Sequence, residues 1–260
     1  MNRILQLKSV ALLALIAAAT PTLAGGEPEP VANNNTVADT PVITGNSIPT
    51  FRTEYDLSAF GLSGNATIEL IKTERPDEYI YRSRTQAKGL AKLVRPDAGT
   101  EASRFLYTDN KIFVQEYDVD AGTGDPLENS YARFDWNLGI VYSNHQEEKV
   151  ELVLEEGILD RFSADLQVML DLRAGKTPDE YTMVHRNSLK TYKFIYEGEE
   201  TVKTKAGTFE TLRYLRQRPG SSRSAYIWYA PEIGYQPVKV TQLKKGKTRG
   251  TLLLKSIHTD

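Results

Sequence analysis

The sequence contains no cysteine and only 3 histidines among its 260 residues. Without cysteine the chain can form no disulfide, can use no thiol as a nucleophile and cannot carry a lipid on an N-terminal cysteine. The histidines, His145, His185 and His258, are far apart in sequence and lack the spacing of zinc ligands. We therefore expect neither a metal site nor a cofactor.

The chain also has little net charge and almost no long apolar run. Its 32 basic and 34 acidic residues give a formal charge of −2, which does not favour binding to nucleic acid. One apolar run covers residues 10–19 and is too short to span a membrane, for which roughly 20 residues are needed. Because small residues at Thr22 and Ala24 follow it, the run indicates a signal peptide cut after Ala24.

This start of the chain predicts the localisation and the domain organisation. We expect residues 1–24 to be the signal peptide and residues 25–47, rich in Pro, Asn, Thr and Gly, to be a flexible linker. Residues 48–260 then form one folded domain. The mature protein is expected in the periplasm, with secretion as the alternative, and without a membrane span.

Most of the folded domain shows the period-two pattern of β-strands. Tyr192, Phe194 and Tyr196 alternate with other residues, and Gly198 is expected to end their strand. Residues 218–222 (RPGSS) are typical of a turn between two strands. The pattern predicts an all-β, mainly antiparallel fold: a single curved sheet or open β-barrel of roughly ten strands with one helix packed on it.

The predicted helix covers residues 160–174. Apolar residues recur on one face at helical spacing: Phe162, Leu166, Met169 and Leu170. Asp160 and Ser163 are expected to cap its N-terminus. A serine nucleophile at Ser163 is the less favoured alternative, because the sequence lacks a G-x-S-x-G elbow and a histidine partner nearby.

Aromatic residues on the expected strands are the best candidates for a ligand site. Trp136, Tyr226, Trp228 and Tyr229 form a candidate apolar groove if the sheet is curved, although a filled core is the favoured interpretation. The basic run 244–249 could contact anionic headgroups or could simply be a charged hairpin tip. Acidic pairs such as residues 147–148 leave a hydrolase open, although paired acids in turns are usually solvated.

Several short segments occur in the order and spacing of a known family. They are GTFETL at residues 207–212, IWYAP at 227–231, QPVKV at 236–240 and GILDRFS at 157–163. The sequence resembles the DUF3108 family, bacterial exported proteins of unknown function, from about Phe51 to the end. The resemblance implies a curved β-sheet or open barrel in the cell envelope, and it carries over no catalytic residue.

These observations together favour an exported, non-enzymatic protein that binds a hydrophobic ligand, such as a lipid or lipoprotein, or an envelope protein partner. Whether it is an enzyme is left open. The alternatives are a hydrolase acting on an envelope polymer and a structural or scaffolding protein. The sequence does not identify the oligomeric state.

Overall fold

The computed structural model describes residues 47–93 and 97–259. The predicted signal peptide (1–24) and the predicted linker (25–47), apart from residue 47, lie outside the described residues. In the described part, a single sheet forms the fold, with one α-helix and three short 3-10 helices.

The first half of the chain contributes eight strands, which follow one another as hairpins. They are β1 (Phe51–Ala59), β2 (Leu62–Lys72), β3 (Glu78–Ala87), β4 (Gly99–Thr108), β5 (Lys111–Asp120), β6 (Ser130–Asp135), β7 (Ile140–His145) and β8 (Glu148–Val153). The 3-10 helices η1 (Gly89–Leu93) and η2 (Pro126–Glu128) lie in the connections after β3 and β5.

The second half contributes seven strands and the helix. They are β9 (Leu159–Asp160), α1 (Arg161–Arg173), β10 (Glu180–Val184), β11 (Leu189–Lys203), β12 (Thr208–Gln217), β13 (Arg223–Ala230), η3 (Pro231–Ile233), β14 (Gln236–Lys244) and β15 (Lys247–Thr259).

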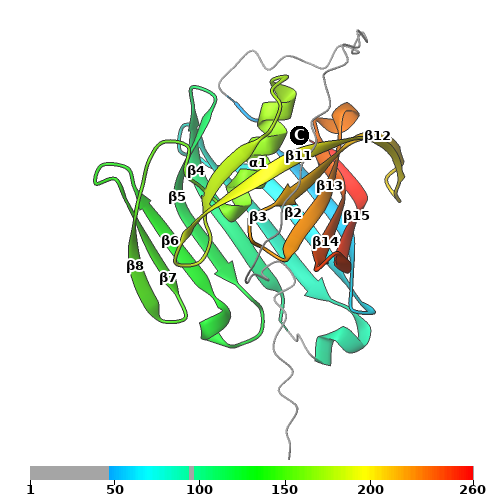
Figure 1. Cartoon of the computed structure of the whole chain (residues 1–260), viewed down its shortest axis with the longest axis horizontal. Helices are drawn as coiled ribbons and strands as arrows, with labels where there is room; N and C mark the ends of the chain where they lie inside the picture. Colours follow the sequence, from blue (N-terminus) through cyan, green and yellow to red (C-terminus); the bar gives the residue numbers. More distant parts are fainter. Residues whose placement is uncertain (1–46, 94–96, 260) are drawn as a thin grey trace, which may run out of the picture.

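The strands lie in the order β8-β7-β6-β5-β4-β3-β2-β1-β15-β14-β13-β12-β11-β10-β9. Every neighbouring pair is antiparallel except β9 and β10, which are parallel. The sheet curls into an open barrel, with α1 on its concave side (Figure 1). The expected all-β, antiparallel, curved sheet with one helix is therefore confirmed, but the expected strand number was too low: the sheet has 15 strands.

A local feature carries one strand beyond its expected end. Gly198 does not end its strand as expected, because it lies at a register shift in the ladder between β11 and β12. A bulge of this kind bends a strand without stopping it, so β11 continues to Lys203.

The two ends of the curled sheet approach each other at one hairpin. The Ser143 hydroxyl on β7 donates to the Arg186 carbonyl in the β10–β11 turn at 2.7 Å. The Asn187 side-chain amide of that turn donates to the Glu148 carbonyl on β8 at 2.9 Å. The barrel is thus drawn together by side chains at this point and not by a continuous strand ladder.

Helix α1 is buried on nearly all sides, which differs from the single apolar face expected. Ala164, Val168 and Leu172, outside the predicted face, are buried as well. A helix that is buried all round belongs inside a core. The reason is that α1 lies within the curl of the sheet, where β4 and β5 contact one side and β10 another.

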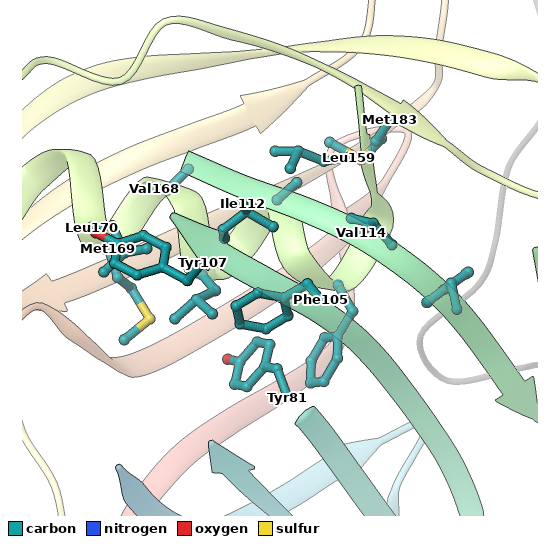
Figure 2. Close-up of a cluster of buried hydrophobic side chains, with 14 of the residues drawn as sticks. Tyr81, Phe105, Tyr107, Ile112, Val114, Leu159, Val168, Met169, Leu170 and Met183 are labelled. Atoms are coloured by element: carbon teal, nitrogen blue, oxygen red, sulfur yellow. The ribbon is translucent and has the colours of Figure 1, made fainter. Parts of the chain in front are cut away.

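Aromatic rings join α1 to the first half of the sheet. Tyr81 on β3 stacks on Phe162 of α1 with ring centroids 4.1 Å apart and planes 9° apart. Figure 2 shows the core around them, with side chains from β4 and β5 facing Val168, Met169 and Leu170 of the helix. Burying each such side chain contributes about 1.5–3 kcal/mol, so this cluster fixes α1 at one end of the barrel.

Candidate functional site

The N-terminus of α1 carries a fully buried carboxylate. Asp160 accepts hydrogen bonds from the backbone amides of Phe162 at 2.7 Å and Ser163 at 2.8 Å. The Ser163 hydroxyl accepts in return from the Asp160 amide at 3.1 Å, which completes a capping box. Burial raises the pKa of Asp160 to about 6, while hydrogen bonds from Ser103 and from the capped turn oppose the rise.

A buried ion pair lies beside this cap. Arg161 of α1 pairs with both carboxylate oxygens of Glu101 on β4, and the Tyr117 hydroxyl donates to Glu101 at 2.6 Å. Burial is the largest influence and acts to lower the pKa of Arg161, but Glu101, Tyr117 and Asp165 together outweigh it, so the net direction is upward. Because each charge has its partner, this group anchors the helix and offers no free acid or base.

Two histidines, His145 and His185, are buried in the barrel. Burial, followed by repulsion from Arg161 and other cations, lowers the pKa of His185 to about 2, so the ring is neutral. The His145 ring contacts Ser130 at 2.9 Å and the Asn129 carbonyl at 3.0 Å. The Ser163 hydroxyl is engaged with Asp160. The Ser130–His145 contact lacks the carboxylate that orients the base in a catalytic triad, because His145 Nε2 finds no hydrogen-bond partner within the described part of the chain.

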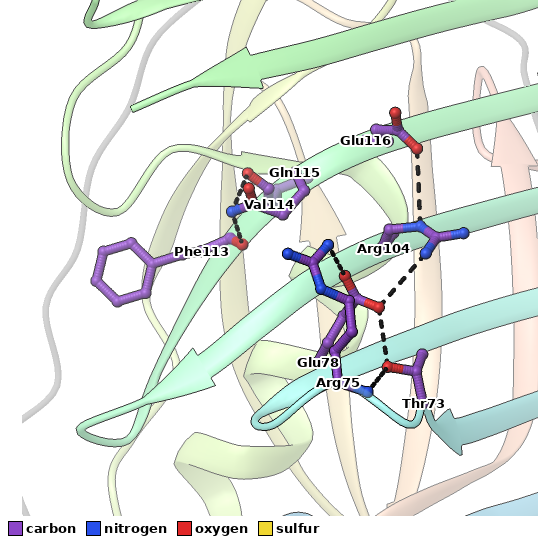
Figure 3. A network of polar contacts seen from close by, with 8 residues as sticks. All are labelled: Thr73, Arg75, Glu78, Arg104, Phe113, Val114, Gln115 and Glu116. Carbon is purple, nitrogen blue, oxygen red and sulfur yellow. Dashed lines mark hydrogen bonds and ion pairs between the residues drawn. The ribbon is translucent and has the colours of Figure 1, made fainter. Parts of the chain in front are cut away.

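Another buried carboxylate, Glu78 on β3, accepts hydrogen bonds from a network of polar side chains on the outer face of the sheet (Figure 3). Thr73 donates to it at 2.8 Å, Arg75 at 3.2 Å and Arg104 at 3.4 Å. The same Arg104 also approaches Glu116 at 3.7 Å. The network stabilises the β2–β3 turn, and it leaves Glu78 without a free oxygen to act as a general acid.

The four aromatic candidates do not lie on one face. Tyr226 and Trp228 point to one side of β13, while Tyr229 points to the other, as alternation along a strand requires. Tyr229 is fully buried in the core beside Tyr214, at 5.9 Å between ring centroids. Trp136 lies between β6 and β7, with its indole N–H donating to the Val114 carbonyl at 2.7 Å.

Trp228 is held in a polar setting on its side of the sheet. Its indole N–H donates to Glu200 at 3.0 Å, and the Lys239 ammonium lies 4.1 Å from the ring centroid. The hydrogen bond from Trp228 is the largest of the causes that lower the pKa of Glu200. Glu200 thus contacts the edge of the indole and Lys239 contacts its face. The indole therefore packs β13 against β11 and β14.

A hollow that the sequence did not point to opens farther along the barrel from α1. On β1 and β3, Phe51 and Tyr81 belong to the core around the helix, whereas Leu57 and Thr85 lie beyond it. We call this space the apolar hollow; it is shallow and partly open to solvent, and it is lined by Leu57, Thr85, Val240, Gln242, Gly250, Thr251 and Leu252.

Strand registers explain why these lining residues meet. Leu57 on β1 lies opposite Leu252 on β15, and Leu252 lies opposite Val240 on β14. They share the inner face because neighbours in register point to the same side. The only sequence signal for the hollow was the alternation within each strand, which does not reveal that helix α1 ends before it reaches this level.

Two further features bear on chemistry and localisation. No group of three or more His, Asp or Glu side chains within residues 47–93 and 97–259 is placed to hold a metal ion. In the same part of the chain, no helix combines the length and the apolar character needed to cross a membrane.

Solved structures resemble this fold at low sequence identity. A crystal structure of a β-barrel-like protein of a domain of unknown function, DUF1849, from Brucella abortus has a TM-score of 0.51 and 11% identity, over 82% of this chain and 98% of that chain. Such a likeness shows the fold alone.

Two more solved structures, a candidate exported protein with a YmcC-like fold from Bacteroides fragilis and a candidate lipoprotein from Parabacteroides distasonis, have TM-scores of 0.36 and 0.34 at 15% and 13% identity. Each covers 82% of this chain, with 97% and 96% of the other chain covered. Scores this low support no conclusion. No curated protein matches the chain. The model of a family described as a protein of unknown function, DUF3108, matches residues 50–252.

Proposed function

This chain belongs to the DUF3108 family, and from that premise we propose that it is an exported, non-enzymatic protein of the cell envelope that binds a hydrophobic ligand inside its curved sheet. The observation that carries this proposal is the apolar hollow, which remains because α1 fills only one end of the barrel. Ligand sites in proteins are commonly concave, apolar spaces of this kind at the mouth of a barrel.

The bound molecule would lie on the inner face of β1, β14 and β15. Leu57, Val240 and Leu252 supply apolar contacts, and Thr85 and Gln242 supply a few polar groups. An apolar wall with a small number of polar groups suits a lipid tail or a similar hydrophobic segment. This location replaces the aromatic groove, since Trp228 and Tyr229 lie on opposite faces of β13.

Export is part of the proposal and has its own support. The apolar run at residues 10–19, followed by small residues up to Ala24, has the form of a cleaved signal peptide. The mature protein would then act in the periplasm, where a lipid in transit needs shelter from water.

The proposal is tested by extracting small molecules from the mature protein, purified without detergent from a periplasmic fraction, and identifying them by mass spectrometry. We expect a hydrophobic compound in near-stoichiometric amount. The variant Val240→Phe fills the hollow and should lose that compound, while Val150→Phe on β8, away from the hollow, should retain it. A wild-type protein without any bound compound, or equal occupancy of the two variants, would refute the proposal and favour a scaffolding role.

A further inference from the structure

Arginines from three separate hairpins gather at the end of the barrel where the hollow opens. They lie in the β10–β11 turn, on either side of the β12–β13 turn and near the start of β15. We call this set the basic rim: Arg186, Arg218, Arg223 and Arg249. All four are partly buried.

Strand registers bring these hairpin ends side by side. Gln217 at the end of β12 lies opposite Ser224 on β13, so Arg218 and Arg223 flank the same turn. Arg223 lies opposite Lys244 on β14, and Lys244 lies opposite Lys247 on β15. The basic run 244–249 therefore adds its charge to arginines that are distant in sequence.

Several guanidinium N–H donors of the rim have no hydrogen-bond acceptor in the described part of the chain. The Nε atoms of Arg218, Arg223 and Arg249 are buried and find no acceptor within the described part of the chain. None of the ion pairs in that part involves a rim arginine. Arg249 instead lies 5.7 Å from the ring centroid of Phe60. A buried N–H without an acceptor is costly, so a ligand that supplied one would be favoured.

The rim charges also repel one another. Burial, and then the charges of Arg186 and Arg249, lower the pKa of Arg223 to about 10. The positive charges of the rim also act on His185, because Arg186 and Arg218 are among the groups that lower its pKa. A negative group placed between these arginines would relieve the repulsion.

The rim borders the apolar hollow directly. Arg249 precedes Gly250, which lines the hollow. On β13, Arg223 lies two residues from Ala225 and on the same face, and Ala225 lies opposite Gln242, another lining residue. A molecule with its tail among Leu57 and Leu252 would thus place its head within the rim.

We propose that the ligand is an anionic amphiphile: its apolar tail occupies the hollow, and its phosphate or carboxylate head lies among the arginines of the basic rim. The planar guanidinium fork matches both kinds of oxyanion and binds them in bidentate fashion. This inference rests on the proposed function and deepens it, since it adds the charge of the ligand to its hydrophobic character. It also gives the basic run 244–249 a role beyond that of a charged hairpin tip.

Isothermal titration calorimetry on the mature chain tests the proposal with three probes: decyl phosphate, decyl maltoside and inorganic phosphate. We expect decyl phosphate to bind at least about tenfold more tightly than decyl maltoside, because charge-assisted hydrogen bonds are the stronger ones. Inorganic phosphate, without a tail, should bind far more weakly than decyl phosphate. The double variant Arg223→Gln/Arg249→Gln should remove the preference for phosphate and leave decyl maltoside binding unchanged.

The matched control is Lys149→Gln/Lys203→Gln, which removes the same charge from exposed positions on β8 and β11. It should leave the binding of decyl phosphate unchanged. If the rim variant does not fold, the wild type still decides the matter: added salt should weaken its binding of decyl phosphate and not of decyl maltoside.

The outcomes separate this inference from the proposed function. Equal affinity for decyl phosphate and decyl maltoside, or an unchanged preference in the rim variant, would overturn the anionic head and leave hydrophobic binding intact. Equal affinity for decyl phosphate and inorganic phosphate would overturn the amphiphile. Failure of both decyl compounds to bind would overturn the inference and the proposed function together.

Discussion

The ion pair between Glu101 and Arg161 provides the sharpest test of how α1 is held inside the barrel. Their side chains are 3% and 9% exposed, and Tyr117 adds a hydrogen bond at 2.6 Å to the same carboxylate. We predict that Arg161→Met destabilises the fold strongly, because it leaves the buried Glu101 carboxylate with the Tyr117 hydroxyl and without a counter-charge.

The size of the stability loss follows from the buried Glu101 carboxylate that remains without its partner. Removing one partner of a buried ion pair typically costs about 3–5 kcal/mol, whereas replacing both by apolar residues of similar volume is often near neutral. For a domain of this size, about 2–4 °C of Tm is lost per kcal/mol. We therefore expect Arg161→Met to lower Tm by roughly 6–20 °C, and Arg161→Met/Glu101→Leu to recover most of that loss.

The assay is thermal and urea unfolding of the mature chain, monitored by tryptophan fluorescence and circular dichroism, for the wild type, Arg161→Met, Glu101→Leu and the double variant. A coupling energy of several kcal/mol in the cycle would support the reasoning. A loss below about 1 kcal/mol in Arg161→Met, within the range of exposed ion pairs, would show that water reaches Glu101 and would refute it.

Two more outcomes follow from buried groups. Since burial lowers the pKa of His185 from 6.5 to about 2, only the unfolded chain protonates it as the pH falls below 6.5, so the wild type loses stability there. His185→Gln should then lose about 2 kcal/mol less than the wild type between pH 6.5 and 5, measured by urea unfolding, and equal losses would contradict the assignment. Gly122→Ala places a Cβ 2.5 Å from the Gly99 nitrogen at φ +66°. The control is Gly124→Ala, where φ is +75° and nothing lies within 4 Å of the added Cβ. Gly122→Ala should lower the free energy of unfolding by about 1–3 kcal/mol more than the control, and equal thermal midpoints of the two variants would contradict this.

The fold was largely readable from local patterns in the sequence. The family suggested by residues 207–212 and 227–231 is confirmed by the match over residues 50–252. The strand number was underestimated, and Gly198, a predicted strand end, lies within β11 at a register shift. The burial of α1 on all sides was also missed, because its apolar residues outside the predicted face matter only once the sheet curls around the helix.

The candidate site was much less accessible to sequence reasoning. Trp228 and Tyr229 were expected in one groove, although adjacent residues on a strand point to opposite faces. The basic rim depends on Arg223 and Arg249, which the registers of β13, β14 and β15 bring to the same end of the sheet. Only the run 244–249 was visible beforehand, because proximity across a sheet is set by register and curvature and leaves no local pattern.

The pairing of β1 with β15 has a consequence for the order of assembly. Phe51 lies opposite Thr259, and Lys255 bonds to Glu54 at 2.9 Å across 201 positions of sequence. Each half of the sheet is a meander of neighbouring strands and can form from local contacts. Joining the halves requires contacts as far apart in sequence as Phe51 with Thr259 and should be slow. A nascent or truncated chain that lacks β15 would therefore expose two unpaired strand edges at the centre of the sheet, where they invite association with other chains.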